Sequence, residues 1–114
     1  MSRQAQQIMG LSITATGVIG EYRFVTPACA QAGAAVNTLG VARMAAALGD
    51  CIPVDVLGTA VVEAGAALTA GGLLETDASG RAVNKAAGVA VARLLPGQVA
   101  TAAGQFVEVL LIPN

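Results

Sequence analysis

The stretch from Ala64 to Val83, AGAALTAGGLLETDASGRAV, constrains the fold of this chain more than any other segment. Asp77-Ala78-Ser79-Gly80 within it has the pattern of a tight turn between two short apolar runs. An Asp at the first turn position can accept hydrogen bonds from backbone NH groups two residues on. A Gly at the fourth position tolerates the positive φ of a type I turn with a bulge. The segment Leu73–Val83 is therefore predicted to be a β-hairpin.

The landmarks of this stretch occur twice in the chain, in the same order. They are a short apolar strand, a glycine, a Gly-Val-Ala triplet and a strand in which valines alternate with an acid. The first copy has FVT at Phe24, then Gly33, Gly40-Val41-Ala42 and GDCIPVDVL from Gly49; the second has LLET at Leu73, then Gly80, Gly88-Val89-Ala90 and GQFVEVLL from Gly104. Two units are too few for a solenoid, which needs about three stacked repeats. We expect instead two similar halves that close on each other.

Period-two alternation and flanking glycines predict further strands. They cover Gly10–Thr16, Glu21–Thr26, Cys51–Leu57, Thr59–Glu63, Val89–Leu95 and Gln105–Ile112. Pro53 lacks an NH, which predicts an edge position for its strand, and Gly58 is predicted to break the chain between two strands. The segment Val41–Leu48 contains good helix formers, so we expect a strand start that bends into one helical turn.

The predicted fold class is mainly β, a small β-barrel or sandwich built from two similar halves with at most one or two short helical turns. Residues 10–114 are predicted to form a single β domain. Residues 1–9, MSRQAQQIM, are polar and glutamine-rich without apolar periodicity, so they are predicted to be an N-terminal arm.

Composition predicts that the stable form is an oligomer or part of a larger assembly. The chain has 114 residues and is 55% hydrophobic but only 3% aromatic, so its apolar content is mostly Ala, Val and Leu. Alanine adds little buried area, so a lone protomer has a thin core. Only 11% of residues are charged, against about 25% in ordinary soluble domains. A sparsely charged apolar surface is typical of an association face.

Charge and hydropathy argue against nucleic acid and membrane partners. The formal net charge is −1, from 6 basic and 7 acidic residues spread singly along the chain. That pattern gives no electrostatic footprint for nucleic acid. No run of about 20 apolar residues is present to span a bilayer. The N-terminus lacks the apolar core of a signal peptide, so we expect a protein that stays in the cytosol or in something assembled there.

The residues give no basis for catalysis, a metal site or a cofactor. The chain contains no histidine, which removes the commonest general base and metal ligand. Cys29 and Cys51 are predicted to be small buried apolar side chains. Glu75 and Asp77 lack the further spaced acids of a calcium loop, and Asp77 is explained by the turn. Lys85 is the only lysine and is interpreted as a solvated charge. We expect a non-enzyme.

A carrier hairpin is the nearest chemical alternative. The segment Val61–Leu74 resembles the lipoyl- and biotinyl-domain pattern, in which a glycine-marked hairpin presents a modified lysine. The predicted hairpin tip here, Thr76–Gly80, contains no lysine. A β-hairpin carrier or small-ligand binding module therefore remains an alternative, although it lacks the lysine that a carrier needs.

The block AGAALTAGGLLETDASGRAV resembles the small capsid decoration (cement) proteins of tailed bacteriophages, and a tail component of such a phage is a further structural option. The resemblance rests on the block AGAALTAGGLLETDASGRAV, Gly88-Val89-Ala90 and the ending from Gly104 to Leu111. Upstream, Leu39-Gly40-Val41-Ala42 and the Gly49–Val56 pattern fit it as well, so it covers roughly residues 10–112. Residues 1–9 have no match in the pattern.

The resemblance implies a virion protein on the outer surface of the capsid, assembled in the host cytoplasm. Its implied partners are the major capsid protein and itself, as a homotrimer, and its implied role is to stabilise the shell. No cofactor is implied. The N-terminal arm is a candidate capsid contact, because such a segment can add a strand to a partner or bury apolar residues against it. Its candidate contact residues are Arg3, Gln4, Gln6, Gln7, Ile8 and Met9.

Overall fold

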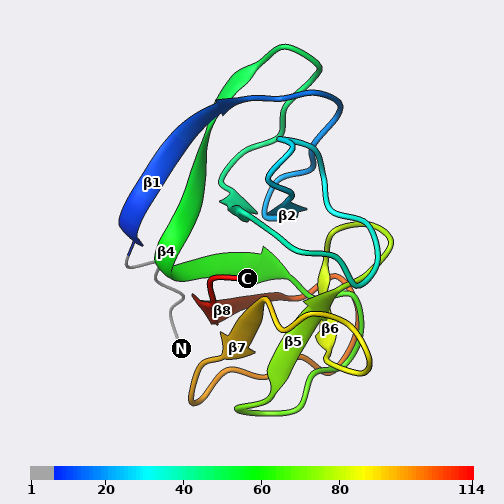
Figure 1. Ribbon diagram of the computed structural model, residues 1–114. Coiled ribbons are helices and arrows are strands. Elements are labelled where there is room, and N and C mark those ends of the chain that lie inside the picture. The colour runs from blue at the N-terminus through cyan, green and yellow to red at the C-terminus, as the bar shows by residue number, and fades with distance from the viewer. Residues whose placement is uncertain (1–6) are drawn as a thin grey trace.

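The computed structural model describes residues 7–114, which form eight β-strands and no helix (Figure 1). The strands are β1 (Gln7–Thr14), β2 (Phe24–Val25), β3 (Gly40–Ala42), β4 (Cys51–Glu63), β5 (Leu73–Thr76), β6 (Ala82–Asn84), β7 (Ala92–Leu94) and β8 (Phe106–Leu111). They form one antiparallel sheet in the order β2-β3-β4-β8-β7-β5-β6, and β1 pairs with β4 outside this path. The sheet curls into a nearly closed barrel, which confirms the mainly β prediction.

The long strand β4 belongs to both halves of the molecule. Its first part pairs with β1 and β3, and its last part, Thr59–Glu63, pairs with β8. Gly58 lies between the two parts with a φ of +99°, a conformation that glycine adopts at little cost. The strand bends sharply along its length (Figure 1). The predicted break at Gly58 is therefore wrong, because the glycine lies within a single continuous strand.

The two halves, residues 7–57 and 58–114, repeat one pairing scheme. The first half places β1, β4, β3 and β2 side by side, and the second places the end of β4, β8, β7 and β5 in the same order. The NH groups of Gly49 and Gly104 donate to the carbonyls of Ala15 and Ala64, each at 2.8 Å. Isolated bridges repeat as well, Ile19 with Ala46 and Leu68 with Ala100. The predicted internal duplication is confirmed in the strand pairing.

One part of the predicted alignment between the halves is wrong. Val25 of β2 lies opposite Gly40, and Leu74 of β5 lies opposite Ala92. The structural counterpart of Gly40 is therefore Ala92 and not Gly88. The Gly-Val-Ala triplet at Gly88 precedes the strand, because the second half has a longer connection before β7.

The predicted hairpin is confirmed. Thr76 lies opposite Ala82, and the intervening turn has Gly80 at a φ of +75°. The Asp77 carboxylate oxygen Oδ1 accepts hydrogen bonds from the backbone NH groups of Ser79 and Arg81, each at 2.8 Å. Asp77 therefore stabilises the turn through the bonds that its position in the sequence predicted.

Two local predictions in the first half are wrong. The strand β4 that contains Pro53 is not an edge strand, because it pairs with β1 and β3, but Pro53 itself lies opposite only Ser12 of β1. Its carbonyl accepts from the Arg43 NH at 3.3 Å, just beyond the end of β3, so the missing proline NH interrupts no ladder bond. The predicted helical turn after Val41 is a series of bends, in which Ala46 exchanges backbone hydrogen bonds with Ile19 at 2.9 Å.

Each half has an apolar core, and the second core includes side chains from the first half. The first core contains Ile13, Ala15, Ile19, Val25, Ala42, Ala46, Ile52 and Val54. The second core is built mainly on β4, β5, β7 and β8. Phe24, Ala32 and Val41 belong to the second core, although their strands and loop lie in the first half. One face of β2 and β3 therefore packs on each core.

Polar contacts fix the halves to each other beside this packing. The buried hydroxyl of Thr76 donates to the Gly33 carbonyl at 2.6 Å and accepts from the Val36 NH at 3.2 Å. Arg23 forms an ion pair with Glu63 at 3.2 Å and donates to the Ser79 carbonyl at 2.8 Å. The halves are therefore held in one arrangement by directional bonds as well as by apolar contact.

Gly40 provides a test of the close approach of β3 to β4. A Cβ at this position collides with the Asp55 carbonyl oxygen, so Gly40→Ala should lower the free energy of unfolding by about 1–3 kcal/mol. Gly33→Ala is the matched control, because a Cβ added there meets nothing within 4 Å. Chemical denaturation should show a change below about 0.5 kcal/mol for that control. Equal effects of the two substitutions would contradict the close approach.

Candidate interaction surfaces

Strand β1 has an uncharged free edge. Its sequence, QIMGLSIT, contains no Lys, Arg, Asp or Glu, and among the described strands it pairs only with β4. Exposed edge strands commonly carry charges or prolines that discourage pairing with another chain. The predicted contact residues Gln7, Ile8 and Met9 lie at the start of this strand, and Met9 is 48% exposed. Arg3, Gln4 and Gln6 lie outside the described residues.

An apolar groove lies beside β1. Its volume is about 300 Å³. It is lined by Met9, Leu11, Pro27, Thr38, Leu39, Val56, Leu57, Pro113 and Asn114. None of these nine side chains is charged. The groove thus brings together residues from the two ends of the described chain and from β4. No sequence motif connects these segments.

The internal duplication explains the origin of the groove. By strand register and backbone bonding, Leu11, Leu39 and Val56 correspond to Ala60, Val91 and Leu111 of the second half. Those three counterparts are only 0%, 1% and 7% exposed, whereas Leu11 is 42% exposed. The groove is therefore the uncovered end of the first core, and the same layer of the second core is covered.

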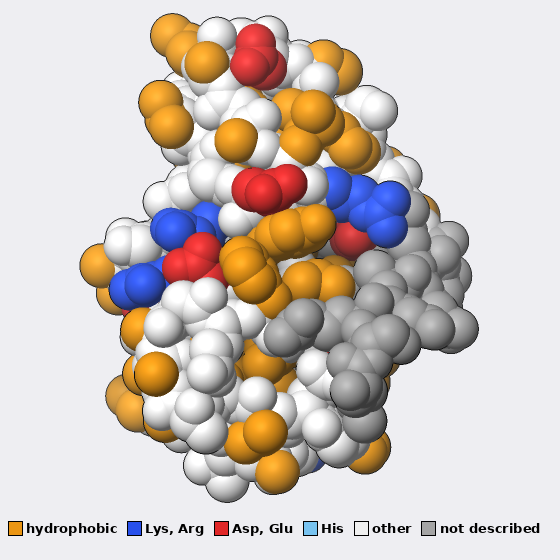
Figure 2. All heavy atoms as spheres, turned by 180° about the vertical axis from the view of Figure 1, so that it is seen from behind, with side chains coloured by type: hydrophobic (Ala, Val, Ile, Leu, Met, Phe, Trp, Pro, Cys, Tyr) orange, Lys and Arg blue, Asp and Glu red, His pale blue; other side chains and the backbone are white. Residues whose placement is uncertain are grey.

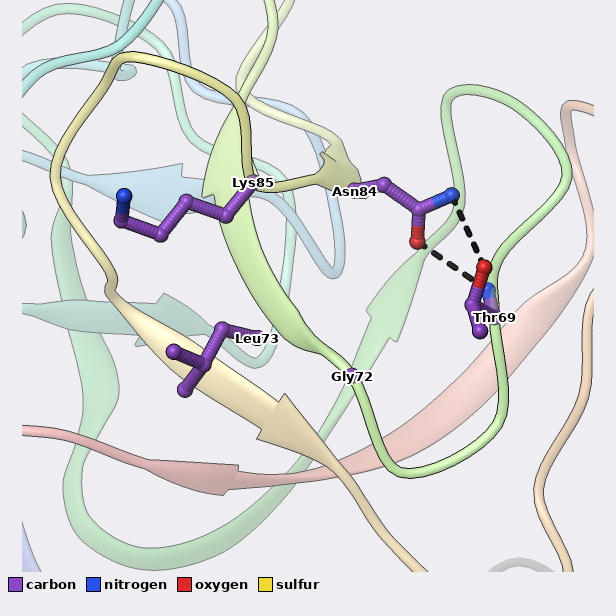
Figure 3. A pocket seen from close by; sticks show the side chains of 5 residues that line it. All are labelled: Thr69, Gly72, Leu73, Asn84 and Lys85. Carbon is purple, nitrogen blue, oxygen red and sulfur yellow. Dashed lines mark hydrogen bonds between the residues drawn. The ribbon is translucent and has the colours of Figure 1, made fainter.

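A second surface lies on the outer side of β5, β6 and β7. Leu73, Lys85 and Arg93 occupy the positions that correspond to Phe24, Ala32 and Val41 in the first half. A shallow pocket of about 330 Å³ is found there, lined by Thr69, Gly72, Leu73, Asn84 and Lys85. Figure 3 shows the Lys85 and Leu73 side chains pointing to the same side, while Asn84 bonds to Thr69. This surface is apolar only at Leu73 and is flanked by two cations.

Six of the twelve charged side chains in residues 7–114 are paired with one another. The ion pairs of the described residues are Arg23–Glu63 at 3.2 Å, Arg43–Asp55 at 3.0 Å, Arg81–Asp77 at 3.1 Å and Arg81–Glu63 at 3.6 Å. Figure 2 shows most of the charged side chains on one face in a band across its middle, with one acidic side chain at the top and hydrophobic side chains above and below the band. Such mutual neutralisation gives no extended field of one sign.

The residues considered for chemistry have structural roles. The Glu75 carboxylate oxygen Oε1 accepts from the NH groups of Ala86 at 2.6 Å and Gly88 at 3.1 Å, which holds the loop after β6. Lys85 is exposed, as predicted, and its Nζ donates to the Ala86 carbonyl at 3.2 Å.

Within residues 7–114, no three His, Cys, Asp or Glu side chains are grouped as a metal would need. In the same range, no helix has the length and apolarity that a membrane crossing requires.

The predicted burial of the two cysteines is wrong for Cys51 and only partly correct for Cys29, which packs against the first core. Both thiols are free; Cys51 is exposed and Cys29 is partly buried. Cys51 begins β4 and faces away from the core side occupied by its buried neighbour Ile52, as strand alternation requires. Cys29 lies in a tight turn with a φ of +66° and donates from its NH to the Thr26 carbonyl at 2.9 Å.

Comparison with known proteins identifies the fold. No protein-family model matches the chain, and no curated protein matches it in sequence. The structure is similar to the crystal structure of the head fiber gp8.5 N base in bacteriophage phi29, with a TM-score of 0.72 and 23% sequence identity. The similarity covers 91% of this chain and 95% of that one. The two proteins therefore share a fold over nearly their whole lengths.

The openness of the groove can be tested by placing a charge at corresponding positions of the two halves. Leu11→Asp should cost no more than about 1 kcal/mol of unfolding free energy, because this side chain is already partly in water. Ala60→Asp should cost at least about 3 kcal/mol or prevent folding, because it buries an unpaired carboxylate. Denaturation monitored by circular dichroism measures both. A severe loss of stability in Leu11→Asp would show that the groove is covered in the free protein.

Proposed function

We propose that this chain is a non-enzymatic phage head decoration (cement) protein that binds the outer surface of the major capsid protein shell and stabilises it. The observation that carries the proposal is the fold shared with a head fiber base of bacteriophage phi29 over 91% of the chain. The sequence resemblance to phage decoration proteins supports the same role independently, because it rests on turn and strand residues and not on overall structure.

The surface chemistry suits an assembly role. The uncharged edge of β1 and the adjoining groove offer backbone hydrogen bonds and apolar area, which are the two means by which β-proteins recognise extended segments. Each contact of a small protein with a shell can be weak, because a symmetric shell repeats it many times. A homotrimer adds to this effect, since linked copies bind with higher avidity than a single copy.

The N-terminal segment is the proposed shell contact. It comprises Arg3, Gln4, Gln6, Gln7, Ile8 and Met9. Gln7, Ile8 and Met9 begin a strand whose other edge has no partner among the described strands, so a strand of the shell protein could continue the sheet there. On this proposal, Arg3, Gln4 and Gln6, which precede the strand in the sequence, contact the same partner.

Binding to shells tests the proposed function. The purified protein is mixed with empty, expanded heads of its phage that lack it, sedimented, and the decorated and bare shells are then heated. We expect stoichiometric co-sedimentation and a higher melting temperature for the decorated shells, because a ligand that binds only the intact shell stabilises it. A defined oligomer that does not bind the shells would instead favour a tail component or a ligand-binding module.

Removal of residues 2–6 tests the N-terminal contact and leaves all of β1 in place. We expect weaker binding to the same shells, with an unchanged unfolding temperature of the isolated protein. The control is replacement of the same residues by a Gly/Ser segment of equal length, which retains the spacing but not the side chains and should also bind weakly. Wild-type affinity of the deletion variant would remove this segment from the shell contact.

A further inference from the structure

The second core shows how the open layer of the first core can be covered. Ala60, Val91 and Leu111 form the end layer of the second core, and they share one buried cluster with Phe24, Ala32 and Val41. These last three residues come from β2, β3 and the loop between them. Apolar side chains of the neighbouring half, one aromatic and two aliphatic, are therefore part of the same buried core as this layer.

The first half has no such cover among the described residues. Leu11, Leu39 and Val56 correspond to the covered layer but line the open groove. Leu11 is 42% exposed, and both Leu39 and Val56 are packed against the first core while only partly buried. An apolar groove of about 300 Å³ without a charged lining residue is well suited to receive apolar side chains.

The surface of a second copy that corresponds to the covering side chains does not match the groove. Phe24, Ala32 and Val41 are fully used inside each copy, where they are 0%, 1% and 0% exposed. The corresponding surface of the second half presents Leu73 between the exposed cations Lys85 and Arg93. Docking that surface into the groove would remove two cations from water, and no lining side chain is a carboxylate that could pair with them, which is unfavourable.

We propose that the groove is the binding site for an apolar segment of the shell protein. On this inference, which rests on the proposed function, the segment closes the first core as Phe24, Ala32 and Val41 close the second. It places aliphatic or aromatic side chains against Leu11, Leu39 and Val56, and it carries no charge at the positions that enter the groove. Met9 lies where this groove meets the N-terminal contact, so one partner segment can engage both.

Matched charge substitutions test the proposal with the same empty heads. Leu11→Asp and Val56→Asp should each weaken shell binding by at least about tenfold, because each places a carboxylate in a desolvated apolar contact. Leu110→Asp is the control, because Leu110 has the same 42% exposure as Leu11 but does not line the groove. It should bind within about twofold of wild type. Unfolding curves of all three variants identify any that fail to fold.

Protection of a thiol gives an independent measurement that needs no charged variant. Cys29 and Cys51 are replaced by serine, and a single cysteine is placed by Leu11→Cys or Leu110→Cys. Maleimide should label both free proteins at similar rates, and shell binding should slow labelling at position 11 at least about tenfold without changing it at position 110.

The outcomes separate this inference from the proposed function. Failure of the wild-type protein to bind shells would overturn the proposed function and this inference with it. Wild-type binding by Leu11→Asp, or undiminished labelling of bound Leu11→Cys, would overturn the inference alone and leave the decoration role in place. Labelling that is already blocked in the free oligomer, and restored by dilution to monomers, would assign the groove to a second copy and overturn the shell partner.

Discussion

Small side chains set the main constraint on this molecule. Alanine and valine bury little area each, so a half of about fifty such residues has a thin core when it stands alone. The two halves therefore share structural elements. Strand β4 runs through both halves, and β2 and β3 pack one face on each core. The hydrogen bonds of Thr76 and the Arg23–Glu63 ion pair then fix the relative position of two units that apolar contact alone would hold less specifically.

Local sequence was sufficient wherever one residue controls one backbone conformation. The hairpin around Asp77 and Gly80 and the paired role of Gly49 and Gly104 could be recognised, because turn geometry restricts which residues fit. It was insufficient where the outcome depends on neighbours distant in the sequence. Gly58 permits either a break or a bend, and only the pairing partners of β4 on both sides select the bend. Pro53 is tolerated within the sheet because β3 ends beside it. The residues around Pro53 do not indicate where β3 ends.

The candidate site was harder to predict than the fold. A β-sheet edge near the N-terminus could be expected from polarity and periodicity, but the groove could not, because its lining combines Met9 and Leu11 with Leu39, Val56 and Pro113. That the groove is an uncovered end of the first core becomes clear only when corresponding residues of the two halves are compared. Leu11 against Ala60 is the informative difference: a larger apolar side chain occupies the position with more solvent exposure. A structural alignment of the repeats, with the Gly40–Ala92 correspondence corrected, is needed to see it.

The cations on the outer surface of the second half also limit growth of the molecule. Stacked repeats can continue as filaments when every unit presents the same apolar end, and natural arrays stop this with polar terminal units. Here Lys85 and Arg93 stand where the first half has Ala32 and Val41, so the stack ends after two units. The two ends of the molecule therefore differ, with an open apolar groove at one and exposed cations at the other. A polypeptide inserted near Lys85 would extend from the cationic end and leave the groove uncovered.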